Sequence, residues 1–403
     1  MRKTLIPILL AAALLLSLLS PLAAAAADAE IPELDPFGPF NIPENEAMTL
    51  LDNMGVGWNL GNTFDAFQDP FYGNEMQLER YWNGCMTTPQ MFDALKNAGF
   101  RSVRIPVSWH NHVDKEFNIS QNWLNRVKAV VDYAYNRGFY VILNTHHDVG
   151  SDYYYPLNQY SETSQRYIQS IWSQVAAKFA DYDEHLIFES MNEPRLKDTN
   201  YEWWIDQNAA QCREAIECIN QLNQLFVDTV RASGGQNETR YLMVPGYCAS
   251  VDGATNKYFR LPADQADNRI IVSVHAYTPY SFALEATGTS VFDLSKMNQK
   301  AEISTFMNTL YKTYIHKGIP VVIGEFGARN KNNNLQSRVN FTAFYTVAAR
   351  SRNIPCIWWD NGAFSGNGEI FGILDRRQAV FTYPDIVNAM ITYQDCRIKT
   401  VAK

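Results

Sequence analysis

Two glutamates stand in short motifs whose residue types suit acid–base chemistry. Glu193 lies in Met-Asn-Glu-Pro, and Glu325 lies in Val-Ile-Gly-Glu-Phe-Gly. Two carboxyl groups that face one cleft can cleave a glycosidic bond, because one donates a proton to the leaving oxygen while the other attacks the anomeric carbon. A separation of about 5 to 5.5 Å gives retention of anomeric configuration and about 6.5 to 9.5 Å gives inversion. No distance follows from the sequence, so both outcomes stay open.

The expected neighbours of the two glutamates distinguish their roles. Arg104 and the Tyr277 hydroxyl can hold Glu325 ionised, which makes it the expected nucleophile. His275 can help to hold the proton of Glu193, which makes that residue the expected general acid and later the general base.

These residues follow predicted strands of a closed barrel. Eight short apolar runs alternate with helical patterns, and the expected strands are 54–60, 102–106, 140–145, 186–189, 241–244, 270–275, 321–325 and 356–359. One expected helix, 208–231, repeats apolar residues on one face: Cys212, Ile216, Ile219, Leu222, Phe226 and Val230. The pattern predicts an α/β protein with a single catalytic (β/α)8 TIM barrel domain. An open doubly wound sheet would want a glycine-rich phosphate loop, which the sequence lacks.

Active sites of such barrels lie at the carboxyl ends of the strands, and these positions are strongly polar here. The residues near or after the carboxyl ends of the expected strands are Arg104, Trp109, His110, His146, His147, Asp148, Asn192, Glu193, His275, Tyr277, Glu325, Trp358 and Trp359.

The residues that precede the barrel divide into two segments. Residues 1–27 combine Arg2 and Lys3 with an apolar run and a small-residue end, which predicts a secretory signal peptide and a secreted protein. The run is shorter than the roughly 20 residues of a spanning helix. Residues 28–46 are expected to form an N-terminal leader and residues 47–403 the catalytic domain. We expect no membrane association after signal cleavage, and no dockerin or carbohydrate-binding module is evident.

Charge and cysteine content narrow the classes of partner. The net charge of −8 becomes −10 once Arg2 and Lys3 are removed, which argues against a nucleic-acid partner. Six cysteines in an exported chain permit disulfides without requiring them. Cys212 and Cys218 cannot pair, because six residues on one helix separate them by about 9 Å along its axis. The remaining pairings stay open.

The motifs together resemble glycoside hydrolase family 5, and within it the subfamily four endoglucanases. The likeness covers the segments 57–63, 103–107, 146–148, 191–195, 219–246, 274–277, 323–327 and 358–362 in order. It implies a retaining mechanism with Glu193 as acid/base and Glu325 as nucleophile, without metal or organic cofactor.

The resemblance also implies roles for the surrounding residues. Arg104 and Tyr277 would steady the nucleophile, His275 would contact the acid/base, and Asn192 and His146 would bind the reacting sugar. Trp359 is the expected stacking platform in preference to Trp358, although strand alternation alone leaves the register open. Further candidates for sugar contact are Asn59, Trp109 and His147; Trp109 suits the core equally well, and His147 suits the cleft wall.

The expected substrate is a β-1,4-linked glucan: cellulose-like, mixed-linkage or xyloglucan. Mannan or xylan cleavage, and a barrel that binds polysaccharide without cleaving it, are the alternatives. Two loops depart from the subfamily pattern, Trp82-Asn83-Gly84-Cys85 and the tyrosine-rich segment 151–160. Both would flank the cleft, so they affect the substrate preference and leave the chemistry intact.

Two further groups of polar residues need an interpretation: a possible metal site and a glutamate inside the barrel. His146, His147 and Asp148 carry ligand types for zinc or manganese, but the other strand ends offer Glu, Asn, Tyr and Trp. We therefore expect no metal there. Glu189, four residues before Glu193, is expected to face the barrel interior and to be paired internally.

Overall fold

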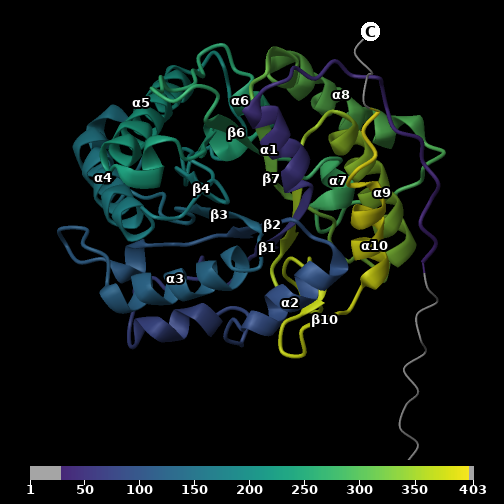
Figure 1. Ribbon diagram of the computed structural model, residues 1–403, viewed down its shortest axis with the longest axis horizontal. Coiled ribbons are helices and arrows are strands. Elements are labelled where there is room, and N and C mark those ends of the chain that lie inside the picture. Colours follow the sequence, from purple (N-terminus) through teal and green to yellow (C-terminus); the bar gives the residue numbers. More distant parts are fainter. Residues whose placement is uncertain (1–28, 399–403) are drawn as a thin grey trace, which may run out of the picture.

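The computed structural model describes residues 29–398, and its centre is a closed barrel of eight parallel strands joined in sequence order. The strands are β1 (Val56–Leu60), β2 (Ser102–Ile105), β3 (Tyr140–Asn144), β4 (Leu186–Glu189), β5 (Leu242–Pro245), β6 (Ile270–His275), β7 (Val321–Phe326) and β8 (Cys356–Asp360). Helices surround the strands (Figure 1). The predicted (β/α)8 barrel is confirmed.

The α-helices lie outside the barrel. They are α1 (Glu46–Met54), α2 (Pro89–Ala98), α3 (Gln121–Tyr135), α4 (Ser161–Lys178), α5 (Ala210–Ala232), α6 (Val251–Ala254), α7 (Tyr280–Ala283), α8 (Met297–Thr313), α9 (Leu335–Ser351) and α10 (Pro384–Tyr393). Short 3-10 helices occupy Glu75–Arg80, His110–His112, Asn158–Tyr160, Gly235–Glu238, Tyr247–Ala249 and Ile315–Lys317. A small hairpin, β9 (Leu374–Asp375) with β10 (Val380–Phe381), follows β8.

All eight predicted strands are present, with ends displaced by at most two residues. The largest displacement is at β1, because the apolar run that predicts this strand begins at Met54. Met54 instead ends α1, and Gly55 follows it with a positive φ of 56° before the strand starts. Apolar character alone does not separate a buried helix end from a buried strand.

The predicted helix 208–231 corresponds to α5, which begins two residues later. All six apolar residues of its predicted inner face are buried. The same helix carries Cys212 and Cys218, which do not pair with each other, as expected, and all six cysteines are free.

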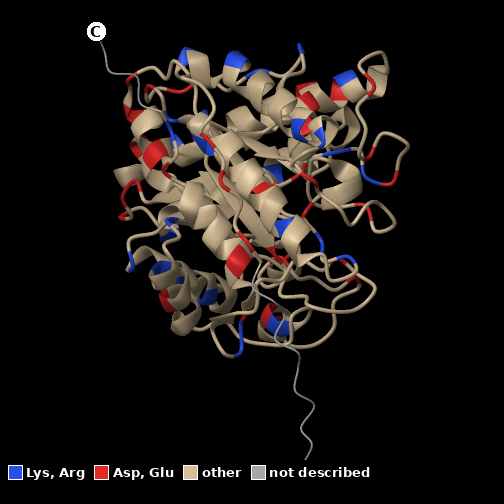
Figure 2. Ribbon diagram, turned by 90° about the vertical axis from the view of Figure 1, so that its right-hand side faces the viewer, with Lys and Arg blue, Asp and Glu red and all other residues tan. Residues whose placement is uncertain are grey.

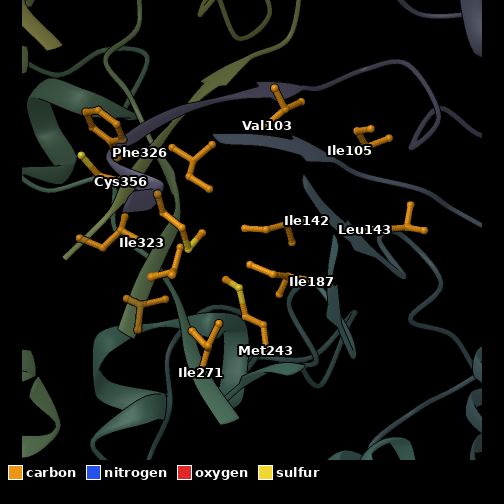
Figure 3. Packing of buried hydrophobic residues seen from close by; sticks show 14 of the residues in the cluster. Val103, Ile105, Ile142, Leu143, Ile187, Met243, Ile271, Ile323, Phe326 and Cys356 are labelled. Atoms are coloured by element: carbon orange, nitrogen blue, oxygen red, sulfur yellow. The ribbon is translucent and has the colours of Figure 1, made fainter. Parts of the chain in front are cut away.

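The strand register places polar side chains inside the upper part of the barrel. Asn59 pairs with Arg104 across β1 and β2, and Asn144 pairs with Glu189 across β3 and β4. Because side chains alternate along a strand, the apolar residues two positions earlier, such as Ile142 and Ile187, face the same interior below them. Figure 3 shows Ile142 and Ile187 within the packed apolar cluster of the barrel.

The expected leader is fixed along the outer helices. Its residues 29–44 contain no helix or strand. Backbone N–H groups nevertheless donate to α9 and α10: Leu34 to the Tyr393 hydroxyl at 3.0 Å and Phe37 to Ser351 Oγ at 2.9 Å. In Figure 1 this purple segment runs beside α9 and α10. The predicted signal peptide lies outside the described residues.

Two properties of the described residues concern the expected absence of membrane and nucleic-acid partners. Within residues 29–398, no helix has both the length and the apolar character needed to cross a membrane. Over the described elements, basic residues are scattered and interspersed with acidic ones (Figure 2).

Arg240 joins the segment before β4 to the start of β5. Its side chain is buried, and all five N–H groups donate to oxygens, the acceptors being Asn237 Oδ1 and the carbonyls of Asp183, Leu186, Phe179 and Tyr182. The guanidinium also lies 4.7 Å from the Phe188 ring centroid.

Replacing Arg240 by Met should lower the free energy of unfolding by about 3 kcal/mol, because several buried carbonyls lose their donors. Arg260→Met is the control, since Arg260 pairs with Glu217 at the exposed surface. Its effect should stay within about 1 kcal/mol. Denaturant unfolding compares the two variants, and equal losses would contradict this account of Arg240.

Candidate active site

Arg104 is the central cation at the barrel mouth, and it is fully buried. Nε donates to Glu189 Oε2 at 2.7 Å, and Nη2 donates to Asn192 Oδ1 at 2.7 Å. Nη1 donates to Glu325 Oε1 at 2.8 Å and to Asn59 Oδ1 at 3.1 Å. Burial lowers the pKa of Arg104, but Glu189 and Glu325 outweigh this effect and raise it, so the guanidinium stays charged.

Glu325 receives a strong donor on each carboxylate oxygen. Besides Arg104 on Oε1, the Tyr277 hydroxyl donates to Oε2 at 2.8 Å. Burial raises the pKa of Glu325, although His275, Arg104 and Tyr277 act in the opposite direction. The phenol of Tyr277 remains a donor, because burial and the charge of Glu325 hold its pKa well above the ordinary value.

Glu193 is linked to His275, whose Nδ1 lies 2.8 Å from Glu193 Oε1 and 3.7 Å from Glu325 Oε1. Burial raises the pKa of Glu193, but the hydrogen bond and charge of His275 outweigh it and leave the pKa below its usual value. Burial lowers the pKa of His275, yet the two carboxylates raise it above the ordinary value. The imidazole therefore serves both glutamates.

The two carboxyl groups are close enough to act on one bond. Oxygens of Glu193 and Glu325 and a ring nitrogen of His275 all lie within 4.8 Å of one another. His275 and Glu325 are register partners at a β-bulge between β6 and β7. Gly324 makes room there, because a Cβ at this position would lie 3.2 Å from His275 Nε2. Bulges beside active sites commonly redirect a side chain in this way.

Trp359 and His146 form parallel rings beside the glutamates, with centroids 5.7 Å apart and an interplanar angle of 4°. Burial, with help from His147 and Arg104, holds the pKa of His146 well below its ordinary value, so this imidazole is neutral. Asn144 Nδ2 lies 3.2 Å from His146 Nδ1. An amide nitrogen can only donate, so Nδ1 accepts and the proton of the neutral ring is on Nε2.

The two tryptophans of β8 have different places. Trp359 pairs in register with Asn59 on the inward face, and it is 7% exposed. Trp358 is fully buried and its Nε1 donates to the Phe371 carbonyl. Gly61 accommodates the Trp359 ring, since a Cβ there would lie 2.8 Å from its edge. The register that the sequence left open thus directs Trp359 to the mouth.

Two of the further candidates for sugar contact are enclosed. Asn59 is fully buried and donates to the carbonyls of Gly324, Ile357 and Trp358. Trp109 is also fully buried, with Nε1 donating to the Asn144 carbonyl. These side chains support the site from below, and neither faces the open cleft. His147 is half-buried and lies on the wall.

No single position is surrounded by the ligand atoms of His146, His147 and Asp148, the possible metal ligands that the sequence suggested. Asp148 Oδ1 accepts the backbone N–H groups of Trp109 and His110 and contacts His110 Nδ1 at 2.7 Å. Asp65 instead lies near His146 and His147, with single ligand atoms of the three residues within 4.8 Å. Asp65 accepts two backbone N–H groups, from Asn62 and Thr63.

An aromatic wall extends from His147 into the two unmatched loops. Phe67 contacts the rings of Trp82, His110 and His147 at centroid distances of 5.3, 5.1 and 5.6 Å. Trp82 contacts His147 at 5.8 Å and is 39% exposed. His110 in turn contacts Tyr153 at 5.2 Å. Both loops therefore flank the cleft, as the sequence led us to expect.

Exposed rings also lie on the side of Glu193, and the sequence analysis did not single them out. Trp204 is 70% exposed and contacts Tyr280 at 6.2 Å. The Arg195 guanidinium lies 4.1 Å from the centroid of Trp203. The adjacent pair Trp203-Trp204, ten residues after Glu193, is a signal that could have identified this surface.

Comparison with known proteins identifies the family of this chain. The chain matches the family model described as cellulase (glycosyl hydrolase family 5) over residues 64–365. It is 41% identical over 357 residues to endoglucanase B of Neocallimastix patriciarum, covering 87% of this chain and 72% of that protein.

Solved structures agree as well. A family 5 lichenase from Caldicellulosiruptor sp. F32 is 53% identical with a TM-score of 0.89, covering 91% of this chain and all of that one. A GH5-4 broad specificity endoglucanase from Ruminococcus champanellensis, with bound cellotriose, is 42% identical with a TM-score of 0.81, covering 87% of this chain and all of that one. The chain therefore belongs to glycoside hydrolase family 5, as its resemblance to subfamily four indicated, and it is a glycoside hydrolase of the endoglucanase type.

Proposed function

We propose that this chain is a secreted endo-β-1,4-glucanase that cleaves internal bonds of β-glucans with retention of configuration, using Glu193 as acid/base and Glu325 as nucleophile. The observation that carries the proposal is the approach of the two carboxyl groups, whose oxygens come within 4.8 Å. This closeness favours direct attack by the second carboxylate, because an inverting enzyme keeps its carboxyl groups about 6.5 to 9.5 Å apart to admit a water.

In the first step Glu325 attacks the anomeric carbon while Glu193 protonates the leaving oxygen. The products are a covalent glycosyl ester on Glu325 and a shortened glucan with a free hydroxyl. Arg104 and Tyr277 keep Glu325 ionised and aimed. Its raised pKa makes the ionised carboxylate a stronger nucleophile than an ordinary glutamate.

The proton for this step comes from the hydrogen-bonded pair of Glu193 and His275. The pKa directions of the free site favour the proton on the imidazole. A glucan that covers the mouth excludes water, and exclusion of water favours the neutral forms of both groups. The proton then moves along the 2.8 Å contact to Glu193 Oε1, from which the leaving oxygen takes it.

In the second step water hydrolyses the glycosyl ester. Glu193, now ionised, removes a proton from the water as its oxygen attacks the anomeric carbon, and the carboxylate of Glu325 leaves. The two inversions give net retention; Glu325 is again a free carboxylate, and the proton that Glu193 took from water returns to His275 when the product leaves.

The sugar in the reacting subsite would lie against Trp359. A ring face of a glucose unit stacks on an indole, and the Nε2–H group of His146 points a donor to the same space. Asn192, held by Arg104, would bind the hydroxyl next to the anomeric carbon. Trp82 would contact sugars beyond this subsite, and Trp204 with Tyr280 would contact sugars of the leaving side.

The signal-like residues 1–27 support secretion of the enzyme. A polymeric glucan is too large to enter a cell intact, so an endo-acting enzyme meets its substrate outside. We assign none of the described residues to a cofactor in this reaction.

The purified protein, with EDTA present, should rapidly lower the viscosity of at least one of carboxymethylcellulose, barley β-glucan and xyloglucan, while reducing ends rise slowly. Glucomannan and xylan in the same panel test the neighbouring polysaccharide classes. Binding to every polymer without cleavage would contradict the proposed function. Loss of activity with EDTA, restored by zinc or manganese, would move the chemistry to the cluster of Asp65, His146 and His147.

Glu325→Gln should lower kcat by several orders of magnitude while the protein stays folded, because an amide keeps the shape but cannot attack. Glu193→Gln should lose activity on glucans yet still form the glycosyl ester from an aryl cellobioside with a strongly acidic leaving group, which needs no proton. Burst kinetics on that substrate separate the two variants. A Glu325→Gln activity within tenfold of the parent enzyme would refute the assignment.

Trp359→Ala should raise KM for cello-oligosaccharides and lower kcat, because the reacting sugar loses its platform. Trp358→Phe is the matched control: it removes the buried hydrogen bond to Phe371 and should lower thermal stability without changing KM. Steady-state kinetics and thermal unfolding test the pair. Unchanged kinetics in Trp359→Ala would place the platform elsewhere.

A further inference from the structure

Glu189 is a fully buried carboxylate that does not face the cleft. It accepts Arg104 Nε at 2.7 Å and Asn144 Nδ2 at 3.0 Å on Oε2, and the Ser273 hydroxyl at 2.6 Å on Oε1. Three strands therefore supply its donors, namely β2, β3 and β6. An ionised carboxylate in the dry interior of a barrel is costly unless it is paired and fully hydrogen-bonded, as it is here.

The contact with Glu189 determines where the rest of Arg104 points. A guanidinium is planar, so fixing Nε on one carboxylate also fixes the directions of Nη1 and Nη2. Those two groups donate to Glu325 Oε1 at 2.8 Å and to Asn192 Oδ1 at 2.7 Å. Without Glu189 the side chain keeps the contact of Nη1 with Asn59 Oδ1 at 3.1 Å and the two partners that it positions, and nothing holds Nε.

We propose that Glu189 is a positioning residue that acts through Arg104: it aims the guanidinium at Glu325 and Asn192 and shares its positive charge with Glu325. This inference rests on the proposed function, in which Glu325 is the nucleophile. Internal pairing of Glu189 was expected from the sequence, whereas this influence on the reaction was not.

The sharing of charge has a definite sign. One guanidinium serves two carboxylates, Glu189 and Glu325, with ion-pair distances of 2.7 and 2.8 Å. Loss of the Glu189 charge leaves Glu325 as the only carboxylate on Arg104, so its ionised form is stabilised and its pKa falls. The other titratable groups around Glu325 remain unchanged: Glu193, His275, Tyr277 and Glu369. A carboxylate of lower basicity is also a weaker nucleophile.

The test compares three variants of the full-length enzyme on a soluble cello-oligosaccharide. Glu189→Gln keeps the shape and removes the charge. Glu189→Asp keeps the charge but is one methylene too short to reach Arg104 Nε. Ser273→Ala is the matched control, because it removes one donor to the same carboxylate and leaves the Arg104 contact in place.

We expect Glu189→Gln to move the acidic limb of the kcat/KM profile to lower pH by about one unit and to lower kcat about tenfold, with KM changed less than twofold. Glu189→Asp should lower kcat about tenfold without moving the limb downward, since the charge is kept. Ser273→Ala should retain the parent kcat and pH profile, even where its thermal stability falls. Active-site titration confirms that each value refers to folded enzyme.

An acidic limb that stays in place in Glu189→Gln would overturn the proposal, because a purely structural role lowers the active fraction without moving a pKa. If Glu189→Gln does not fold, a folded Glu189→Asp with the parent kcat would overturn it equally. Failure of the proposed function has a different signature: the parent enzyme would cleave no β-glucan, or Glu325→Gln would remain active.

Discussion

A positive charge in a dry barrel is the constraint on which this site depends. Arg104 is fully buried, so its N–H groups depend on oxygens of the protein, and four hydrogen bonds reach Glu189, Asn59, Glu325 and Asn192. Buried charge is tolerated only in paired and hydrogen-bonded networks such as this one, and removing one partner of a buried pair typically costs about 3 to 5 kcal/mol. The same contacts that pair Arg104 also orient Glu325, the proposed nucleophile, so folding stability and the geometry of the site depend on one set of contacts.

The barrel supplies this geometry through strand alternation and one irregularity. Regular alternation places Asn59, Arg104, Asn144 and Glu189 on the inward face, where apolar residues fill the layer below. Regular pairing alone would not bring His275 Nδ1 between the two glutamates. The bulge between β6 and β7, together with the missing side chain of Gly324, allows the imidazole to contact Glu193 at 2.8 Å while it stays 3.7 Å from Glu325.

Much of this architecture was predictable because its signals are local. Apolar runs of four to seven residues indicated the eight strands, and polar side chains at or after the ends of most of them indicated the residues of the site. What the sequence could not supply is the register: Trp358 and Trp359 are adjacent and chemically equal, and only pairing with β1 sends one to the core and the other to the mouth. Trp109 had the same ambiguity and lies in the core. The exposed pair Trp203-Trp204 was overlooked because it belongs to a loop, where no periodicity draws attention to a surface.

The buried centre and the exposed flanks of the site are held in different ways, which under the proposed function separates the reaction from the choice of glucan. The groups that contact Glu325 belong to strands or lie just after them, so Glu325 cannot move without disturbing the buried network. The rings farther out are held differently. Trp82 and Trp204 belong to loops and are 39% and 70% exposed. Their ring centroids lie 5.3 to 6.2 Å from those of neighbouring rings. Stacking on such rings recognises the face of a sugar and tolerates differences in linkage and substitution. Under the proposed function, these exposed loop rings would determine the preference among glucans, whereas the reaction itself would take place at Glu193 and Glu325.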